Sequence, residues 1–328
     1  MIMNQNKDNQ IIAIIIPYYN ASSKITKVIS AVPAFIDFVI IVDDCGIEPL
    51  PEQAILESIN ELTQVVFLKN TKNLGVGGAT KTGFVKAIEL NIDIVVKIDA
   101  DNQMDLGYLP VLIDSLLKDQ AEYAKGNRFR DLKALKKMPF VRRIGNLFLS
   151  FLIKISTGYW NVFDPTNGYF ALNVSVLKQL DLDKIANRYF FEASLIAELY
   201  YFKVRIKDIT MPAIYNDEKS SMQVWKMPII FSWNLGKLFV KRIVKQYFLY
   251  DFNIGSIYIL FGVPLFLFGI IFGIIKWIYF SSNHMLAPTG TIMLITLSII
   301  LGFQLLLQAI QFDIINSPRV KNHEQDSN

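Results

Sequence analysis

The sequence contains little of the chemistry that cross-links a chain or binds a soft metal. Its single cysteine, Cys45, excludes an internal disulfide and indicates a reducing compartment. Its two histidines, His284 and His323, lie far from the segments that predict a sheet. A zinc site built on histidine is therefore not expected.

The chain also lacks a strong charge imbalance. Its formal net charge is +4 at pH 7, which is too small to indicate a nucleic-acid partner. Residues 1–10 are polar and contain no apolar signal core, so we expect a loose tail there. No internal repeat or low-complexity segment is evident, and 328 residues suffice for one catalytic domain and a smaller part.

Apolar residues, by contrast, are abundant: they make up 52% of the chain, and the mean hydropathy is +0.33. Residues 254–275 carry no charge over about 22 positions, or ~33 Å as a helix, which is enough to cross a bilayer. Residues 285–312 form a second uncharged span. Two buried core helices are the alternative, but uncharged spans of ~20 residues are rare in soluble cores.

The flanks of these spans predict an orientation. Residues 227–250 are aromatic and basic, as in a helix that lies in a membrane interface, with Lys237, Lys241, Arg242 and Lys245. Lys and Arg flank the pair of spans but are absent from the link between them. The positive-inside rule then places both ends, and the preceding α/β domain, in the cytoplasm.

Apolar β-branched runs alternate with helical patterns over residues 11–211. This alternation predicts a doubly wound α/β sheet with right-handed crossovers. The strands are expected at 11–16, 38–42, 65–68, 94–98, 122–125 and 204–211, with another after the turn at 164–168.

The fourth of these strands ends in two carboxylates. Residues 94–98 form an apolar run typical of a strand that is buried on both faces, and Asp99, Ala100 and Asp101 follow directly. Open α/β sheets bind ligands at the carboxyl ends of their strands. A divalent cation would relieve the repulsion between the two acids, and all-oxygen ligation suits Mg²⁺ or Mn²⁺. Two solvated acids on a loop are the alternative.

A glycine cluster, Asn73-Leu74-Gly75-Val76-Gly77-Gly78-Ala79-Thr80-Lys81-Thr82, follows the third strand. It is not a phosphate-binding P-loop, because Thr80 stands where that loop needs its second glycine. A dinucleotide fingerprint would need an acid of its own about 20 residues further on. Two interpretations stay open: a flexible loop that brings a helix N-terminus close to a nucleotide, or glycines that permit a tight turn and close packing.

Other polar residues are ambiguous when taken singly. Asp43 and Asp44, after the second strand, could bind a base and ribose or cap a loop. Asp164, before Pro165, fits ordinary turn chemistry, and Glu192, at a helix start, fits capping. Four arginines could bind phosphate or form a solvated basic face: Arg128, Arg130, Arg142 and Arg143.

The order of these pieces is more specific than any one of them. The chain resembles family 2 glycosyltransferases of the GT-A fold, within them the polyprenyl-phosphate glycosyltransferases related to dolichol-phosphate mannose synthase and the bacterial O-antigen glucosylating enzymes. The resemblance covers residues 11–211, and the two apolar spans match a subset of the family. It is carried by Ile14-Ile15-Ile16-Pro17-Tyr18-Tyr19-Asn20, Ile41-Val42-Asp43-Asp44, the glycine cluster, Asp99-Ala100-Asp101-Asn102-Gln103, Gly126-Asn127-Arg128-Phe129 and Asp164-Pro165-Thr166-Asn167-Gly168-Tyr169.

The resemblance implies a metal-dependent hexosyltransferase that inverts the sugar. It would transfer the sugar from a UDP- or GDP-linked donor to undecaprenyl or dolichyl phosphate, for cell-surface glycan synthesis. Asp99 and Asp101 would hold the metal, and Asp164 stands where the family has its proposed base. The nucleotide sugar would contact Pro17, Tyr19, Asn20, Asp43, Asp44, Gly75, Gly77, Gly78, Lys81, Asp99, Ala100, Asp101 and Gln103. The acceptor phosphate would contact Arg128, Arg130, Arg142 and Lys219.

The expected organisation is that of an integral protein of the bacterial inner membrane, with a GT-A Rossmann-like mixed sheet followed by an interfacial helix and a transmembrane hairpin. Relatives form homotetramers, but the oligomeric state stays open. Two alternatives are a glycosyltransferase that extends a lipid-linked or polysaccharide acceptor and an inactive membrane scaffold of the same fold. The expected segments are a tail at 1–10, a cytoplasmic catalytic domain at 11–226, a juxtamembrane segment at 227–253, a two-helix hairpin at 254–313 (about 254–280 and 286–312) and a cytoplasmic tail at 314–328.

Overall fold

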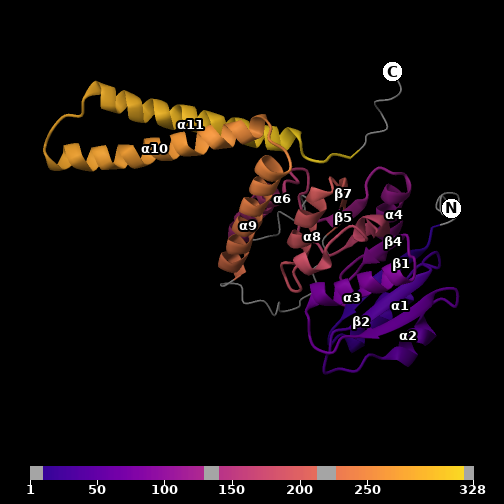
Figure 1. Cartoon of the computed structure of the whole chain (residues 1–328). Helices are drawn as coiled ribbons and strands as arrows, with labels where there is room; N and C mark the ends of the chain where they lie inside the picture. Colours follow the sequence, from indigo (N-terminus) through magenta and orange to yellow (C-terminus); the bar gives the residue numbers. More distant parts are fainter. Residues whose placement is uncertain (1–9, 129–139, 213–226, 321–328) are drawn as a thin grey trace, which may run out of the picture. The chain divides into compact units, whose positions relative to one another are not determined.

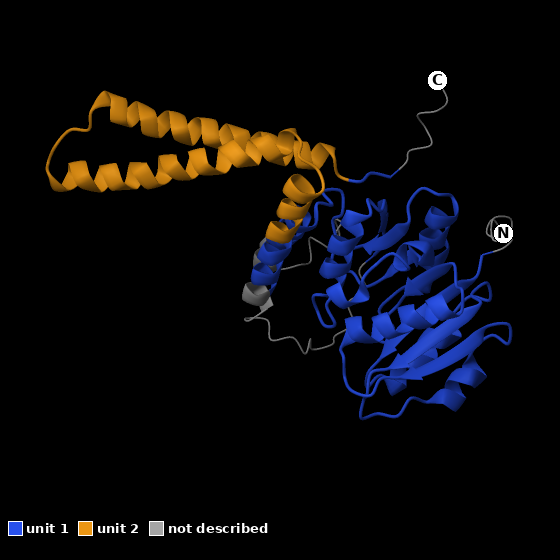
Figure 2. Cartoon of the chain, viewed as in Figure 1, with its two compact units in different colours: residues 1–238, 318–328 blue, residues 239–317 orange. Residues whose placement is uncertain are grey.

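The computed structural model describes residues 10–128, 140–212 and 227–320, except for the side chains of residues 140–144, 146 and 227–230. The chain divides into two compact units (Figure 2): unit 1 comprises residues 1–238 and 318–328, and unit 2 comprises residues 239–317. The division falls within helix α9 (Met227–Val244).

Unit 1 is built on a seven-stranded sheet in the order β3-β2-β1-β4-β6-β5-β7. Figure 1 labels β1, β2, β4, β5 and β7 of this sheet. Strand β6 runs antiparallel to both its neighbours, and the other neighbouring strands are parallel. This is the mixed sheet that the resemblance implies. The strands are β1 (Ile12–Tyr18), β2 (Phe38–Asp43), β3 (Gln64–Lys69), β4 (Ile94–Lys97), β5 (Tyr123–Asn127), β6 (Phe170–Asn173) and β7 (Ile206–Thr210).

Helices cover both faces of this sheet, which explains why its central strands are apolar without alternation. On one face, Ile14 and Val96 pack with residues of α1, α2 and α4. On the other face, Ile15 and Val95 pack with residues of α3, α7 and α8. The helices and 3₁₀ turns of unit 1 are α1 (Ser22–Ser30), α2 (Glu52–Ser58), α3 (Val76–Glu89), η2 (Leu106–Tyr108), α4 (Leu109–Leu117), α6 (Phe140–Thr157), α7 (Val174–Leu177), η3 (Leu182–Lys184) and α8 (Phe191–Tyr201).

A smaller apolar cluster attaches two further helices to α8. Ile153 of α6, Ala193 of α8 and Leu235 of α9 are each at most 2% exposed and pack together. Residues 146–157 carry apolar side chains at helical spacing, a pattern that suits a core face or, after the basic run before it, a membrane surface. Ile153 lies in a core, whereas Leu147 and Phe148 are exposed. The membrane-surface interpretation stays a prediction.

Unit 2 is dominated by two paired helices, α10 (Ile254–Ser282) and α11 (Thr289–Ile315). Both are long and apolar enough to cross a membrane, as the uncharged spans 254–275 and 285–312 predict. Glycine lets their backbones approach closely, since a Cβ on Gly302 would lie 2.5 Å from the backbone nitrogen of Phe266. Asn253 caps α10 in a reciprocal capping box with Ser256.

A buried ion pair joins α9 to the end of α11 within unit 2. Arg242 donates to both carboxylate oxygens of Asp313, at 2.6 and 3.0 Å, and the Tyr247 hydroxyl, in the π-helical turn η4 (Lys245–Leu249), donates to the same carboxylate at 2.7 Å. Arg242 is only 2% exposed. The expectation that Arg242 belongs to a basic interfacial surface is therefore wrong, because its charge is satisfied inside the unit.

Candidate active site

The carboxyl ends of the parallel strands bring the predicted acids to one edge of the sheet. Strand β1 lies between β2 and β4 and is parallel to both, so the loops that follow the three strands open on the same side. Asp43 is the last residue of β2, and Asp99 and Asp101 follow the end of β4. The edge therefore collects carboxylates from two loops.

Asp99 and Asp101 lie in a tight turn beyond β4. The backbone N–H of Gln103 donates to Asp101 at 3.0 Å, and Asn102 takes a positive φ of 59°. Burial raises the pKa of Asp101, and the negative charge of Asp99 raises it further. The side chain of Asp99 keeps 31% of its surface exposed. The pair is therefore electrostatically strained and reachable from solvent.

The two carboxylates of Asp99 and Asp101 could supply part of the coordination shell of a hard divalent cation. Carboxylate oxygens are the ligands that Mg²⁺ and Mn²⁺ prefer, and such ions usually keep waters and take phosphate oxygens. Within the described residues, no group of three or more His, Cys, Asp or Glu side chains is placed to hold a metal ion. Two carboxylates therefore suit a cation whose remaining ligands come from water and a bound diphosphate.

Lys97, at the end of β4, is a site residue that the sequence analysis missed. Its side chain is 1% exposed, and its ammonium group lies 2.5 Å from a carboxylate oxygen of Asp99. Glu192, in the first turn of α8, is partly buried, and burial raises the pKa of its carboxyl. The sequence signal for Lys97 was its place in an otherwise apolar buried strand, because a buried charge needs a partner.

Asp44 holds the glycine cluster in place. Its carboxylate accepts hydrogen bonds from the Asn70 amide at 2.7 Å and from the backbone N–H groups of Leu74 and Gly75 at 2.9 and 2.7 Å. Gly75 has a φ of 85°, which favours glycine. The loop between β3 and α3 is therefore tied to the end of β2, and Asp44 has a structural role whatever else it binds.

Two of the three glycines inside α3, Gly77 and Gly78, permit close packing. A Cβ on Gly77 would lie 2.6 Å from the Cβ of Phe191, and a Cβ on Gly78 would lie 2.3 Å from that of Leu74. The Lys81 ammonium group donates to the carbonyls of Leu182 and Ile185 at 3.1 and 2.9 Å. The packing interpretation of the glycine cluster thus describes α3, and Lys81 fastens it to the η3 segment.

The loop after β1 is hydrogen-bonded to the loop after β2. Asn20 has a φ of 49°, and its side-chain oxygen accepts from the backbone N–H groups of Ile47 and Glu48 at 2.7 and 3.1 Å. Asp43 forms a 3.2 Å ion pair with Lys69. In the sheet, Pro17 of β1 pairs in register with Val42 of β2. Of the other predicted nucleotide-binding residues, Tyr19 is 51% exposed and Ala100 is 5% exposed. The predicted nucleotide-binding residues Pro17, Asn20 and Asp43 therefore belong to neighbouring segments.

Asp164 forms a second, separate centre with Arg128. Its side chain is fully buried, and Arg128 binds it through Nε at 2.7 Å, Nη2 at 3.1 Å and the backbone N–H at 3.1 Å. Burial alone would raise the pKa of Asp164, but the Arg128 hydrogen bonds and the charges of Arg128 and Lys125 outweigh it, so the pKa is lowered. Lys125 also donates to the Asp164 carbonyl at 2.5 Å.

Three predicted phosphate ligands cannot be placed. Arg130 and Lys219 lie outside the described residues, and so does the side chain of Arg142. Their roles stay predictions from the resemblance. Arg128, the fourth, is described: its side chain is 35% exposed, although its guanidinium binds Asp164.

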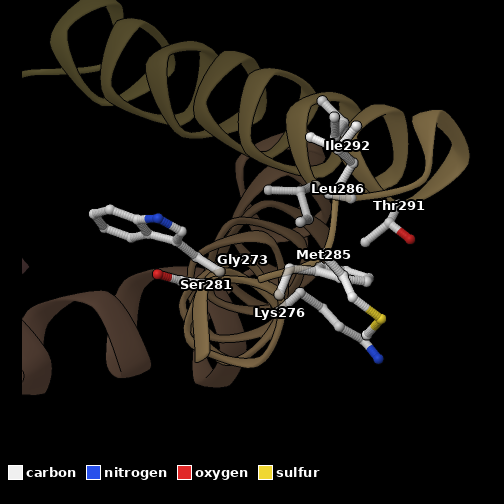
Figure 3. A pocket seen from close by; sticks show the side chains of 11 residues that line it. Gly273, Lys276, Ser281, Met285, Leu286, Thr291 and Ile292 are labelled. Carbon is white, nitrogen blue, oxygen red and sulfur yellow. The ribbon is translucent and has the colours of Figure 1, made fainter. Parts of the chain in front are cut away.

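A cavity of about 400 Å³ lies in unit 2 at the loop end of the helix pair (Figure 3). None of its lining residues is acidic, and the one charged side chain is Lys276. The Lys276 ammonium group lies 5.5 Å from the ring centres of both Phe272 and Tyr279. The lining is mostly apolar and contains no carboxylate or histidine, so it differs in chemistry from the acidic edge of the sheet.

Known proteins resemble this chain in sequence. Residues 13–181 match the model for glycosyl transferase family 2. The UDP-N-acetylglucosamine–dolichyl-phosphate N-acetylglucosaminyltransferase of Methanococcus voltae is 34% identical over 224 residues, which cover 64% of this chain and 88% of that protein. The undecaprenyl-phosphate mannosyltransferase of Micrococcus luteus is 28% identical over 53% of this chain and 71% of its own length.

A solved structure shows the same fold. Glucosyl-3-phosphoglycerate synthase from Mycobacterium tuberculosis, crystallised with Mn²⁺, UDP and glucosyl-3-phosphoglycerate, superposes with a TM-score of 0.52 at 18% identity. The match covers 72% of this chain and 81% of that one. At this identity the likeness concerns the fold alone.

Proposed function

The chain belongs to glycosyl transferase family 2, and from that premise we propose that it transfers a sugar from a nucleotide diphosphate sugar to a polyprenyl phosphate. The observation that supports this most strongly is the acid pair, Asp99 and Asp101, in the turn after β4. It lies at the sheet edge where α/β folds bind their ligands. The relatives named for transfer to dolichyl or undecaprenyl phosphate support the acceptor class.

The reaction would need little acid–base help from the protein. The second pKa of a phosphate monoester is about 6, so the acceptor is largely ionised at pH 7 and its oxygen can attack the anomeric carbon from the side opposite the diphosphate. A Mg²⁺ or Mn²⁺ ion at Asp99 and Asp101 would neutralise the charge that develops on the leaving diphosphate. Arg128 would offset the repulsion between the acceptor phosphate and the donor diphosphate.

Asp164 would orient Arg128 rather than remove a proton. Its pKa is lowered and its carboxylate already accepts three hydrogen bonds from Arg128, so it is a weak base that is occupied. The fixed guanidinium can then meet the acceptor phosphate without reorganisation at the moment of reaction. The family's proposed base thus becomes a positioning residue in this chain.

The apolar helices α10 and α11 would hold the protein in the membrane. An acceptor with a long polyprenyl chain stays in the bilayer, so the site must work at the depth of the lipid headgroups. The positive flanks favour a cytoplasmic position for the catalytic unit and both termini. A bacterial inner membrane and a homotetramer belong to the same proposal, by resemblance.

The test is a screen of radiolabelled nucleotide sugars with purified full-length protein in detergent. UDP-N-acetylglucosamine and GDP-mannose are offered with undecaprenyl or dolichyl phosphate, with and without Mn²⁺, and label is measured in the lipid extract. Transfer of one sugar by the wild type, and none by Asp101→Asn, is the expected result. Failure of every donor with every polyprenyl phosphate would contradict the proposal.

A further inference from the structure

Lys97 carries a charge in the interior of the sheet. It is the last residue of β4, between the apolar strand and the acid pair, and its side chain is 1% exposed. A buried ammonium group without a partner is costly, and Asp99 supplies that partner at 2.5 Å. Asp99 therefore has two uses: it is a proposed cation ligand and it balances an internal cation.

Gly168 marks the place where three charged groups converge. A Cβ built on Gly168 would lie 2.4 Å from the Lys97 ammonium nitrogen and 3.3 Å from oxygens of both Asp99 and Glu192. The three groups come from β4, from the turn after β4 and from the first turn of α8. The missing side chain of Gly168 leaves the room that the ammonium group occupies. Lys97 forms an ion pair with Asp99, and its positive charge also acts on the carboxyl of Glu192.

We propose that Lys97 is an internal counter-ion that competes with the divalent cation for Asp99, and that Glu192 weakens this competition by attracting Lys97. The inference rests on the proposed function, since it takes the cation to be that of the donor diphosphate. A cation that uses Asp99 without a nucleotide must approach a fixed positive charge. The negative charge of a diphosphate offsets that repulsion. Lys97 therefore makes cation binding conditional on the donor.

Two substitutions move the cation affinity in opposite directions. Lys97→Met removes the positive charge at nearly constant length, so Mn²⁺ should bind at least about tenfold more tightly without nucleotide. Glu192→Gln removes the competing negative charge, so Lys97 holds Asp99 more firmly and Mn²⁺ should bind about threefold or more weakly. A general loss of folding would weaken binding in both variants, and so cannot imitate this pattern.

Lys125 provides a matched control. Lys97 and Lys125 both pair in register with Phe170, one from each side, so the two lysines lie on the same face of the sheet. Lys125 is 0% exposed, and its ammonium group donates to the Asp164 carbonyl rather than to Asp99. Both lysines act electrostatically on Glu192, but only Lys97 is hydrogen-bonded to Asp99. Lys125→Met therefore deletes an equally buried charge without freeing Asp99, and its Mn²⁺ affinity should stay within about twofold of the wild type.

The experiment titrates Mn²⁺ into the full-length protein in detergent and follows free Mn²⁺ by electron paramagnetic resonance, first alone and then with saturating UDP. The expected order of affinity without UDP is Lys97→Met, then wild type together with Lys125→Met, then Glu192→Gln. UDP should raise the affinity of the wild type by a larger factor than that of Lys97→Met. Equal or weaker binding by folded Lys97→Met would overturn the inference.

Glu192→Gln decides the question if Lys97→Met does not fold, provided that its circular dichroism and unfolding temperature match those of the wild type. Weaker Mn²⁺ binding by this folded variant supports the inference, and equal or tighter binding overturns it. Failure of the proposed function has a different signature. In that case the wild type transfers no sugar to any polyprenyl phosphate, whatever the order of Mn²⁺ affinities.

Discussion

The two acidic centres of unit 1 differ in what surrounds their carboxylates. Asp99 and Asp101 lie in an accessible turn, and burial with mutual repulsion raises the pKa of Asp101. Asp164 is fully buried, and Arg128 and Lys125 lower its pKa. The first centre places two carboxylates beside one ammonium group, that of Lys97, so it keeps a net negative charge that a ligand can neutralise. The second pairs one carboxylate with Arg128 and lies beside Lys125. Carboxylates in two centres of one unit can therefore have opposite tasks.

The first prediction concerns the acid pair and should give the largest effect. Asp101→Asn keeps the size of the side chain but removes the charge that would hold the cation. We expect the transfer rate to fall by about 10³-fold, as when a major electrostatic contribution is removed. The rate is measured by label transfer to polyprenyl phosphate. A variant that keeps a tenth of the wild-type rate would contradict the assignment.

The second prediction uses Asp313 to separate the effect of a broken buried ion pair from an effect on chemistry. Asp313→Asn leaves Arg242, 2% exposed, without its charged partner, so the free energy of unfolding should fall by about 3 kcal/mol. Thermal unfolding of the full-length protein in detergent measures this. The double variant Arg242→Met with Asp313→Leu should recover most of the loss. Equal destabilisation by single and double variants would show that the pair is not coupled.

The third prediction is that Asp164→Asn reduces the transfer rate less than Asp101→Asn does. We expect a loss of about 30-fold, because Arg128 keeps its place less firmly but the ionised acceptor needs no base. The loss should appear largely as a raised KM for the polyprenyl phosphate. Complete and equal inactivation by the two substitutions would contradict the division of tasks.

The fourth and smallest effect concerns the pH dependence of stability. Because Arg128 and Lys125 lower the pKa of Asp164 below its ordinary value in the folded protein, its contribution to stability is fully present above the unfolded pKa and is lost as the pH falls through the lower folded pKa. The difference in unfolding temperature between wild type and Asp164→Asn should therefore stay constant from pH 8 to pH 5 and shrink only below about pH 4. Shrinkage already between pH 7 and pH 5 would argue against an ionised, paired Asp164.

Local patterns in the sequence predicted much of this molecule. The run into Asp99 and Asp101 predicted a buried strand with acids at its end, and β4 with its following turn confirms that. The apolar helix expected at about 254–280 corresponds to α10, Ile254–Ser282. Apolar periodicity and charge depletion are properties of consecutive residues, so they can be read without knowing the fold.

What the sequence could not predict depends on contacts between distant segments. Arg242 and Asp313 are 71 residues apart, and Arg128 and Asp164 are 36 apart. Nothing in either neighbourhood indicates the partner. The reversed direction of β6 and the tie from Asp44 to Gly75 also arise only when the chain packs. Whether a charged residue meets a ligand or stabilises the fold depends on the residue with which it pairs, and tertiary structure determines that partner.

The most direct test of the central claim is a structure of the full-length protein with Mn²⁺ and a nucleoside diphosphate, in which anomalous scattering locates the metal. The account predicts one strong Mn²⁺ peak within coordination distance of a carboxylate oxygen of Asp99 or Asp101 and of a diphosphate oxygen. A bound nucleotide whose diphosphate and metal both lie away from this turn would contradict it.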